Sequence, residues 1–278
     1  MKHFSNTAAL RITGVALLVA AFGFLMYGIL KPGMPETVAD FFFLQTKEDA
    51  DCTLLLSDGK SILIDTGEAQ DFETIRELLR LQKVECIDCM ILTHPDKDHI
   101  GSALALAQEF SVGIVVEPYY AKEKERYQRL NEELDRLGIP RMELTQTRQF
   151  AYGELRLTVY PPEKREYNKD NNYSLAVAVS HGRTSLFFAG DAYNARTKEL
   201  LRLPLCPADV YHASYHGRDY ENGAALLEAL SPRNVIVTSD RAGVGTQSAC
   251  DALGSTVFYT RSGTVHLQSS GNGVTRIP

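Results

Sequence analysis

The sequence predicts an α/β (α+β) domain, an αββα sandwich of two mixed sheets with helices outside, behind one N-terminal transmembrane helix. Three observations predict this fold. Short apolar runs typical of buried strands alternate with segments of helical spacing. Several of these runs end in histidine or aspartate, at the strand ends where α/β sheets place their sites. One segment near the N-terminus is long and uncharged enough to cross a bilayer.

Length, composition and charge limit the classes of protein to which this chain can belong. The 278 residues, 44% of them apolar, suffice for one large domain or two small ones. The net charge of −6 gives no general attraction to nucleic acid, although a local basic groove stays open. The five cysteines are odd in number and form no spaced framework. Cys86 and Cys89 form a Cys-x-x-Cys pair without a second pair, so we favour buried small residues over a redox or zinc role.

The N-terminal part is expected to be a membrane anchor. Lys2 and Arg11 precede its apolar run, so the positive-inside rule makes this a single-pass protein of the cell membrane with an extracytoplasmic C-terminal domain. A cleaved signal peptide is the alternative, with Val19-Ala20-Ala21 as a loose cleavage site, but the apolar run continues past it. The expected parts are a cytoplasmic N-terminus (1–11), a transmembrane anchor (12–30), a linker (31–38) and a globular domain (39–278).

The first half of the globular domain is predicted to alternate strands and helices. Phe41-Phe42-Phe43-Leu44 opens it, and Asp58-Gly59 is a strong hairpin turn between two apolar runs. Apolar residues at helical spacing mark the helices. The expected elements are strands over 52–57, 61–65, 87–92 and 112–116, and helices over 71–81, 121–137 and from about 101.

The second half repeats this alternation. Arg261-Ser262-Gly263 is expected to join a closing pair of strands, 257–260 and 264–267. The other expected elements are strands over 155–159, 175–179, 185–189, 208–213 and 234–238, and helices over 193–203 and around 226–230.

Ligand-type residues concentrate directly after the predicted strand 87–92. Two imidazoles and two carboxylates fall within six positions there. Together they suit a divalent cation such as Zn, Mn or Fe, and there is no thiolate to favour a softer one. A solvated turn rich in Asp and His is the alternative, which this density disfavours. The residues of this predicted metal site are His94, Asp96, Asp98 and His99.

The run His94-x-Asp96-x-Asp98-His99 resembles the His-x-His-x-Asp-His motif of the metallo-β-lactamase superfamily, with aspartate at the second histidine. In this form it is similar to the metallo-β-lactamase-like domain of ComEC-type competence proteins. Ile64-Asp65-Thr66-Gly67 resembles the superfamily's Asp-Thr-Gly motif, which implies that Asp65 supports the metal loop without being a ligand. The stretch 47–51 departs from the family's Gly-Gln-Gly-Asp turn, which leaves its role open.

Two further segments extend the resemblance. The segment from Asn171 is similar to the Asn-Asn-x-Ser of ComEC-type domains, and we expect Asn172 and Ser174 to support the site or to contact substrate. Most superfamily members have a ligand histidine in this region; His181 is the only candidate, and we expect it in a surface turn. Gly190-Asp191 follows a buried strand, and the resemblance implies that this aspartate bridges two metals. A helix N-cap is the alternative.

The segment from Ser214 to Arg218 resembles the His-His-Gly-Ser of the same domains. We expect His216 to bind metal, and Tyr215 to be a weaker ligand or a transition-state donor. Arg218 is expected to contact a phosphate or simply to face solvent. His212, three residues earlier, is expected to point elsewhere.

These expectations describe a hydrolase with one or two divalent metal ions, Zn or Mn. A metal lowers the pKa of bound water toward ~7, so that hydroxide is available at neutral pH. Asp98, which would orient the hydroxide, and His216 are the expected catalytic residues. The expected ligands are His94 and Asp96 at one metal, Asp98, His99 and His216 at the other, and Asp191 between them.

The substrate class comes from the resemblance alone. ComEC-type domains are thought to act on DNA, which implies a phosphodiester substrate. One alternative is a hydrolase of small phosphoesters or cell-envelope components. Another is a degenerate binding module without turnover, which Tyr215, the missing mid-chain histidine and the altered stretch 47–51 motivate.

Overall fold

The structure, a computed structural model, describes residues 36–278. The expected cytoplasmic N-terminus, the transmembrane anchor and most of the linker lie outside the described residues. Within residues 36–278, every helix is too short or too polar to cross a bilayer.

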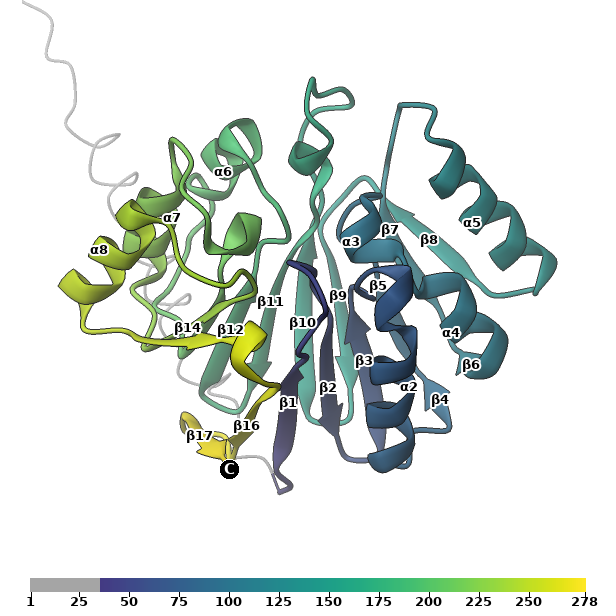
Figure 1. Cartoon of the computed structure of the whole chain (residues 1–278), viewed down its shortest axis with the longest axis horizontal. Helices are drawn as coiled ribbons and strands as arrows, with labels where there is room; N and C mark the ends of the chain where they lie inside the picture. Colours follow the sequence, from purple (N-terminus) through teal and green to yellow (C-terminus); the bar gives the residue numbers. More distant parts are fainter. Residues whose placement is uncertain (1–35) are drawn as a thin grey trace, which may run out of the picture. The chain divides into compact units, whose positions relative to one another are not determined.

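Two mixed β-sheets lie face to face at the centre of the domain, and helices cover their outer faces (Figure 1). The first sheet has the strand order β17-β16-β1-β2-β3-β5-β7-β8. Its strands are antiparallel from β17 to β3 and parallel from β3 to β8. Their bounds are β1 (Ala39–Phe43), β2 (Thr53–Ser57), β3 (Lys60–Ile64), β5 (Cys89–Ile91), β7 (Val115–Pro118), β8 (Arg141–Leu144), β16 (Val265–Ser269) and β17 (Val274–Ile277).

The second sheet has the strand order β15-β14-β13-β12-β11-β10-β9. It is antiparallel from β9 to β12 and parallel from β12 to β15. A separate short pair joins β4 (Cys86–Ile87) and β6 (Ser111–Val112). The strands of the second sheet are β9 (Arg148–Tyr152), β10 (Leu155–Tyr160), β11 (Ala176–His181), β12 (Thr184–Phe188), β13 (Val210–His212), β14 (Asn234–Val237) and β15 (Thr256–Tyr259).

Helices pack on both outer faces because the parallel strands are apolar on both sides. In β5, for example, Cys89 and Ile91 join the core between the sheets, whereas Met90 packs under the helices of the first sheet. The helices on the first sheet are α2 (Phe72–Leu81), α4 (Ala103–Glu109) and α5 (Glu125–Arg136), with the short α3 (Lys97–Ile100) before α4. Those on the second are α6 (Asn194–Leu200), α7 (Gly223–Leu230) and α8 (Val244–Leu253).

The αββα sandwich and the Asp58-Gly59 hairpin are confirmed, but the predicted closing pair of strands is wrong. β15 pairs in parallel with β14 in the second sheet, whereas β16 pairs with β1 in the first. The chain changes sheets through the 3₁₀ turn Thr260–Ser262. The turn signal at 261–263 therefore marked a crossover between layers, which local sequence does not distinguish from a hairpin.

Other differences are local. The predicted strand 87–92 divides into β4 and β5 at Asp88, whose carboxylate accepts hydrogen bonds from Lys60 and from the backbone N–H of Ser61. The predicted helix 121–137 begins at Glu125 because Lys124 has extended backbone angles. Strands β8, β9 and β17 and helix α8 were not predicted.

The cysteines give a direct test of this fold. Cys52, Cys89 and Cys250 are buried and Cys86 and Cys206 are exposed, so the prediction of two buried residues in the Cys-x-x-Cys pair is right for Cys89 and wrong for Cys86. Burial raises the pKa of Cys89 to about 12 and that of Cys250 to about 11. We expect a thiol reagent to label two of the five thiols in the native protein and all five in denaturant. Rapid native labelling of more than two would contradict the packing described.

Candidate metal centre

Strand ends from both sheets meet at one edge of the sandwich. Asp65 follows β3, the loop from Thr93 follows β5, Asp191 follows β12, and His216 follows β13. Since parallel strands all point their carboxyl ends to the same edge, residues far apart in sequence come together there. The glycine of Gly190-Asp191 is required in this conformation, because its φ is +51° and a Cβ would lie 2.8 Å from the Thr93 Oγ1.

Four donor groups at this edge are spaced like the ligands of one cation. The Nε2 of His216 lies 3.2 Å from an oxygen of Asp98 and 3.4 Å from one of Asp191. The Nε2 of His99 lies 3.4 Å from the other Asp191 oxygen and 3.7 Å from Asp98. Tetrahedral ligands at about 2.1 Å from a metal are about 3.4 Å apart. These four imidazole–carboxylate separations are those expected for ligands of a single divalent cation.

Unsatisfied polar atoms point to the same conclusion. The Nε2 of His99 and one oxygen of Asp191, both in this group of four donors, are buried and have no hydrogen-bond partner within residues 36–278; the Nε2 of His94, 3.3 Å from Asp96, is likewise buried without one. Buried polar atoms are rarely left without a partner, because the loss of hydration is costly. A divalent cation would bind imidazole nitrogen and carboxylate oxygen, so the residues present fit one.

Two further carboxylates hold the histidines from behind. An oxygen of Asp65 lies 2.8 Å from the Nδ1 of His99, and an oxygen of Asp51 lies 3.1 Å from the Nδ1 of His216. A carboxylate on Nδ1 fixes the tautomer that leaves Nε2 free for a metal. Asp65 thus lies where the resemblance to the superfamily predicted a supporting residue. It also accepts hydrogen bonds from the backbone N–H and the hydroxyl of Thr93.

Asp51, which the sequence motifs did not identify, lies beside the same donor atoms. Asp51, His99, Asp191 and His216 each offer one ligand-type atom within 4.8 Å of the others. Because Asp51 contacts the Nδ1 side of His216 and also accepts a hydrogen bond from Thr238, we infer that it orients His216 and is not itself a ligand. The available signal was that the stretch 47–51 ends in aspartate, as does the family's Gly-Gln-Gly-Asp turn.

The charges of the cluster depend on one another. Burial by itself would lower the pKa of His99, but the carboxylates of Asp65 and Asp191 raise it well above its ordinary value. Burial would raise the pKa of Asp191, but His216 and His99 hold it well below its ordinary value. Against the effect of burial, the pKa of His216 is likewise held well above its ordinary value by Asp191 and Asp51, so a metal that binds to His99 and His216 would displace protons from them.

The second expected metal position, at His94 and Asp96, has fewer donor groups. The Nε2 of His94 lies 3.3 Å from one oxygen of Asp96, and the centre of the His94 ring lies 4.1 Å from that of the His99 ring, with the two planes tilted by 53°. The second oxygen of Asp96 accepts a hydrogen bond from the ammonium of Lys124, which also lies 3.0 Å from Asp170. The side-chain contacts of Asp191 are with His99, His216 and Asn171. Its role as a bridge to a metal at His94 and Asp96 remains a prediction.

The Asn-Asn-x-Ser segment supports Asp191, but through a different asparagine from the one expected. Asn171 donates its side-chain N–H to Asp191 at 2.9 Å, and the Ser174 hydroxyl accepts a hydrogen bond from the Asp191 backbone N–H. The expectation for Asn172 is corrected, because its side-chain oxygen accepts a hydrogen bond from the Arg196 backbone N–H in α6. Adjacent residues of this short 3₁₀ turn face different neighbours, which the motif alone does not assign.

The residues next to His216 contact other side chains of the domain. Tyr215 packs edge-on against Tyr193 and Tyr220, and Arg218 forms an ion pair with Asp49. The Nδ1 of His212 lies 3.7 Å from Asp51, behind the cluster.

The expectation that His181 lies in a surface turn is wrong. It is fully buried at the end of β11, and its Nδ1 lies 3.0 Å from the Ser269 hydroxyl. The turn between β16 and β17 covers it, since the Arg183 backbone N–H bonds to Gly271 in that turn. His181 thus lies away from the donor cluster.

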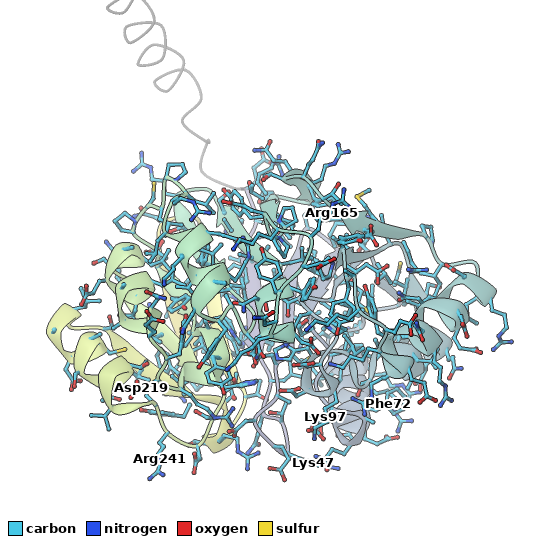
Figure 2. All side chains as sticks on the ribbon, turned by 90° about the horizontal axis from the view of Figure 1, so that it is seen from above. Lys47, Phe72, Lys97, Arg165, Asp219 and Arg241 are labelled. Atoms are coloured by element: carbon cyan, nitrogen blue, oxygen red, sulfur yellow. The ribbon has the colours of Figure 1, made fainter. Side chains whose placement is uncertain are left out.

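A hollow of about 650 Å³ opens beside Asp98. Lys97 points outward from α3 at this rim (Figure 2) and pairs with Glu68. The hollow mixes acidic and basic side chains, namely Glu48, Asp49, Glu68, Lys97, Asp98, Arg218, Asp240 and Arg261.

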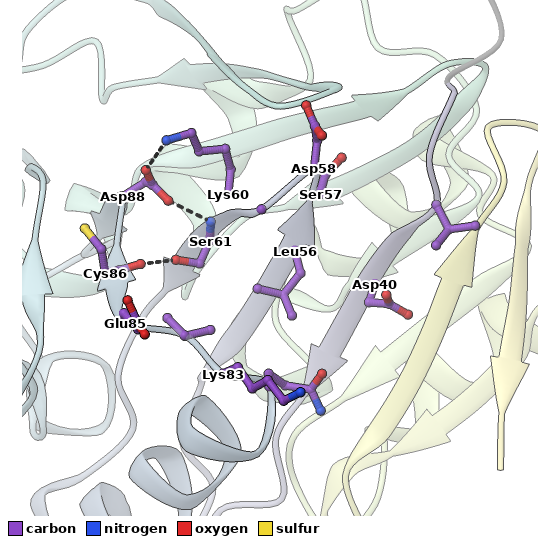
Figure 3. A pocket seen from close by; sticks show the side chains of 14 residues that line it. Asp40, Leu56, Ser57, Asp58, Lys60, Ser61, Lys83, Glu85, Cys86 and Asp88 are labelled. Atoms are coloured by element: carbon purple, nitrogen blue, oxygen red, sulfur yellow. Dashed lines mark hydrogen bonds and ion pairs between the residues drawn. The ribbon is translucent and has the colours of Figure 1, made fainter.

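A second pocket, of about 480 Å³, lies at the opposite end of the first sheet, around the turn of the β2–β3 hairpin (Figure 3). Asp88 is already paired there with Lys60 and the backbone N–H of Ser61, and the Ser61 hydroxyl bonds to the carbonyl of Cys86. The pocket thus lacks the convergent imidazole and carboxylate donors that are found at the donor cluster.

Comparison with known proteins agrees with the geometry. The model of the metallo-β-lactamase superfamily matches residues 46–237. The chain belongs to this superfamily. Among solved structures it is similar to YhfI of Bacillus subtilis, a metallo-β-lactamase fold protein, with a TM-score of 0.57 at 14% identity over 84% of this chain and 100% of that one. It is also similar to CmlA of Streptomyces venezuelae, a diiron β-hydroxylase, with a TM-score of 0.52 at 17% identity over 87% of this chain and 55% of that one.

Two curated relatives are competence and recombination proteins, in line with the resemblance to ComEC-type domains. The chain is 25% identical over 193 residues to Recombination protein 2 of Haemophilus influenzae, covering 68% of this chain and 23% of that protein. It is 28% identical over 171 residues to ComE operon protein 3 of Bacillus subtilis, covering 59% of this chain and 21% of that protein. The chain thus matches less than a quarter of the length of either relative.

The support that Asp51 gives to His216 can be tested by substitution. Asp51→Asn removes the charge behind His216 and leaves the shape unchanged, so we expect metal affinity to fall about 10- to 100-fold. Competition with a chromophoric chelator measures this affinity. Asp40→Asn is the matched control, since Asp40 also pairs with a histidine, His266, but at the other end of the first sheet. Equal affinities in the two variants would remove Asp51 from the centre.

Proposed function

We propose that this protein is a membrane-anchored, metal-dependent hydrolase that cleaves phosphodiester bonds. The observation that carries the proposal is the group of four donors at 3.2–3.7 Å, two imidazoles and two carboxylates, that converge from separate strand ends. Membership of the metallo-β-lactamase superfamily and similarity to two competence and recombination proteins support it. The identity of the metal, Zn or Mn, is left to experiment.

In this mechanism His99, His216, Asp98 and Asp191 would hold the cation. A divalent cation bound there acts as a Lewis acid and makes water a nucleophile at neutral pH. Asp98 has a second role, because it lines the open hollow and its side chain is 21% exposed, whereas those of the other three are nearly fully buried. Burial would raise its pKa, but His216 and His99 hold the pKa below its ordinary value. Asp98 is therefore an ionised carboxylate at the place where water enters, and it orients the attacking water.

Tyr215 and Arg218 remain proposed substrate contacts. Arg218 lines the hollow, and its guanidinium lies 5.7 Å from the centre of the Tyr215 ring. A phosphate oxygen would compete with Asp49 for this arginine.

A second candidate function is hydrolysis of small phosphoesters or cell-envelope components. The acidic residues that line the hollow outnumber the basic ones, a charge balance that disfavours a long polyanion. Activity on bis-p-nitrophenyl phosphate without activity on plasmid or single-stranded DNA would favour this candidate. Activity on both favours the phosphodiesterase proposed above.

The metal centre is tested through Asp191. We expect Asp191→Asn to lose bound metal and to reduce bis-p-nitrophenyl phosphate hydrolysis by at least about 100-fold, because both of its oxygens face imidazole donors. Elemental analysis and initial rates measure the two effects. Asp251→Asn, at an exposed position of α8, is the control. Full metal content in Asp191→Asn would contradict its role, and an unmodified protein with much less than one equivalent of metal would indicate a binding module without turnover.

Membrane anchoring is tested by fractionation. We expect the full chain to stay with the membranes after washes with high salt and with carbonate, because the uncharged, mostly apolar segment 12–30 is close to the length that crosses a bilayer as a helix. Protease added outside the cytoplasmic membrane should digest the globular domain, as the positive-inside rule predicts. Recovery of the full chain in the soluble fraction would contradict the anchor.

A further inference from the structure

We propose that the ammonium group of Lys124 takes the place of a second metal cation, so that the centre holds one tightly bound cation and not two. This inference rests on the metal centre proposed above. It concerns the half of the site formed by His94 and Asp96, which we call the outer half. The half formed by His99, His216, Asp98 and Asp191 is called the inner half.

The outer half has few donors. Its described donor–donor contact is the 3.3 Å approach between the Nε2 of His94 and one oxygen of Asp96. The segment from Asn171 has asparagine and serine side chains that bond to Asp191 and the backbone, and it adds no imidazole. The inner half, by contrast, has four donors at ligand spacing and a carboxylate behind each imidazole.

Lys124 brings a fixed positive charge into the outer half. Its ammonium bonds to the Asp96 oxygen that does not face His94, and it lies 3.0 Å from Asp170. Lys122 also pairs with Asp170, at 2.7 Å. The side chains of Lys124, Asp96 and Asp170 are 26–27% exposed, so solvent screens these charges only in part.

The position of Lys124 is set by the fold. It is the last extended residue before α5, with φ −133° and ψ 106°, and α5 is fixed on the first sheet by the buried Tyr127, Leu130 and Leu134. The backbone of Lys124 is therefore anchored directly before a packed helix.

Counting charges separates the two halves. In the inner half, the two ligand carboxylates, Asp98 and Asp191, carry two negative charges, which match one divalent cation, and Asp51 and Asp65 behind the imidazoles add two more. In the outer half, the ammonium of Lys124 already balances the single carboxylate of Asp96. A second divalent cation at Asp96 would have a neutral imidazole, a carboxylate shared with Lys124 and at most one oxygen of Asp191, which already faces His99 and His216, and it would lie close to a like charge.

The test is metal stoichiometry, which does not depend on turnover. We expect the purified full chain, saturated with Mn²⁺ and desalted, to keep about one equivalent by elemental analysis and to show the electron paramagnetic resonance spectrum of isolated Mn²⁺. Lys124→Met removes the charge at similar length, and it should raise the retained Mn²⁺ toward two equivalents with a spin-coupled spectrum. Lys124→Arg keeps the charge and should retain one equivalent.

Lys122→Met is the matched control, because Lys122 pairs with Asp170 but not with Asp96; it should retain one equivalent. Asp96→Asn provides an independent variant, and it too should retain one equivalent, whereas a two-metal centre would lose one. Two equivalents in the unmodified chain, or a single equivalent in a folded Lys124→Met variant, would overturn the role of Lys124 and leave the hydrolase proposal standing. An unmodified chain that binds no metal would instead overturn the proposed function itself.

Discussion

The contact of the Asp65 carboxylate with Thr93 and His99 holds the two strand ends of the first sheet together, and the donor cluster depends on it. One oxygen of Asp65 accepts the Thr93 backbone N–H at 2.7 Å, and the other contacts the Thr93 hydroxyl and the Nδ1 of His99. Asp65 is 1% exposed and has a φ of 57°, a left-handed conformation that is uncommon outside glycine. A buried carboxylate of this kind is stable only when its oxygens are satisfied, so the three contacts are mutually required.

Backbone hydrogen bonds extend this constraint to the neighbouring loops. The Thr66 N–H bonds to the His99 carbonyl, the Gly67 N–H to that of Asp51, and the Asp51 N–H to that of Asp98. Three segments separated by up to about fifty residues are thereby held in fixed register. These bonds keep the imidazoles and the carboxylates in contact in a buried site. A less precise arrangement would leave buried charges unpaired, which is costly.

The second sheet contributes through a strained turn. Tyr215 and His216 both have left-handed backbone angles, with φ of 55° and 57°. Such conformations cost about 1–3 kcal/mol each and persist where surrounding contacts fix them. Here the Ser239 hydroxyl bonds to the His216 carbonyl, and Asp51 and Thr238 lie 3.1 and 3.0 Å from the His216 Nδ1. In this backbone conformation the Nε2 of His216 points toward Asp98 and Asp191, so the position of this donor depends on the conformation of the loop.

The sequence by itself determined the layers of the fold and most of the donor residues. Apolar runs that end in His94–His99, in Asp191 and in His216 were readable because strand period and ligand chemistry are local properties. Tertiary structure alone decided which of these groups face one another, that Asp51 supports His216, that Asn171 rather than Asn172 contacts Asp191, and that Lys124 pairs with Asp96. The physical reason is that each of these pairs joins segments 20 or more positions apart, and the position of one segment on another depends on how the two sheets and their helices pack.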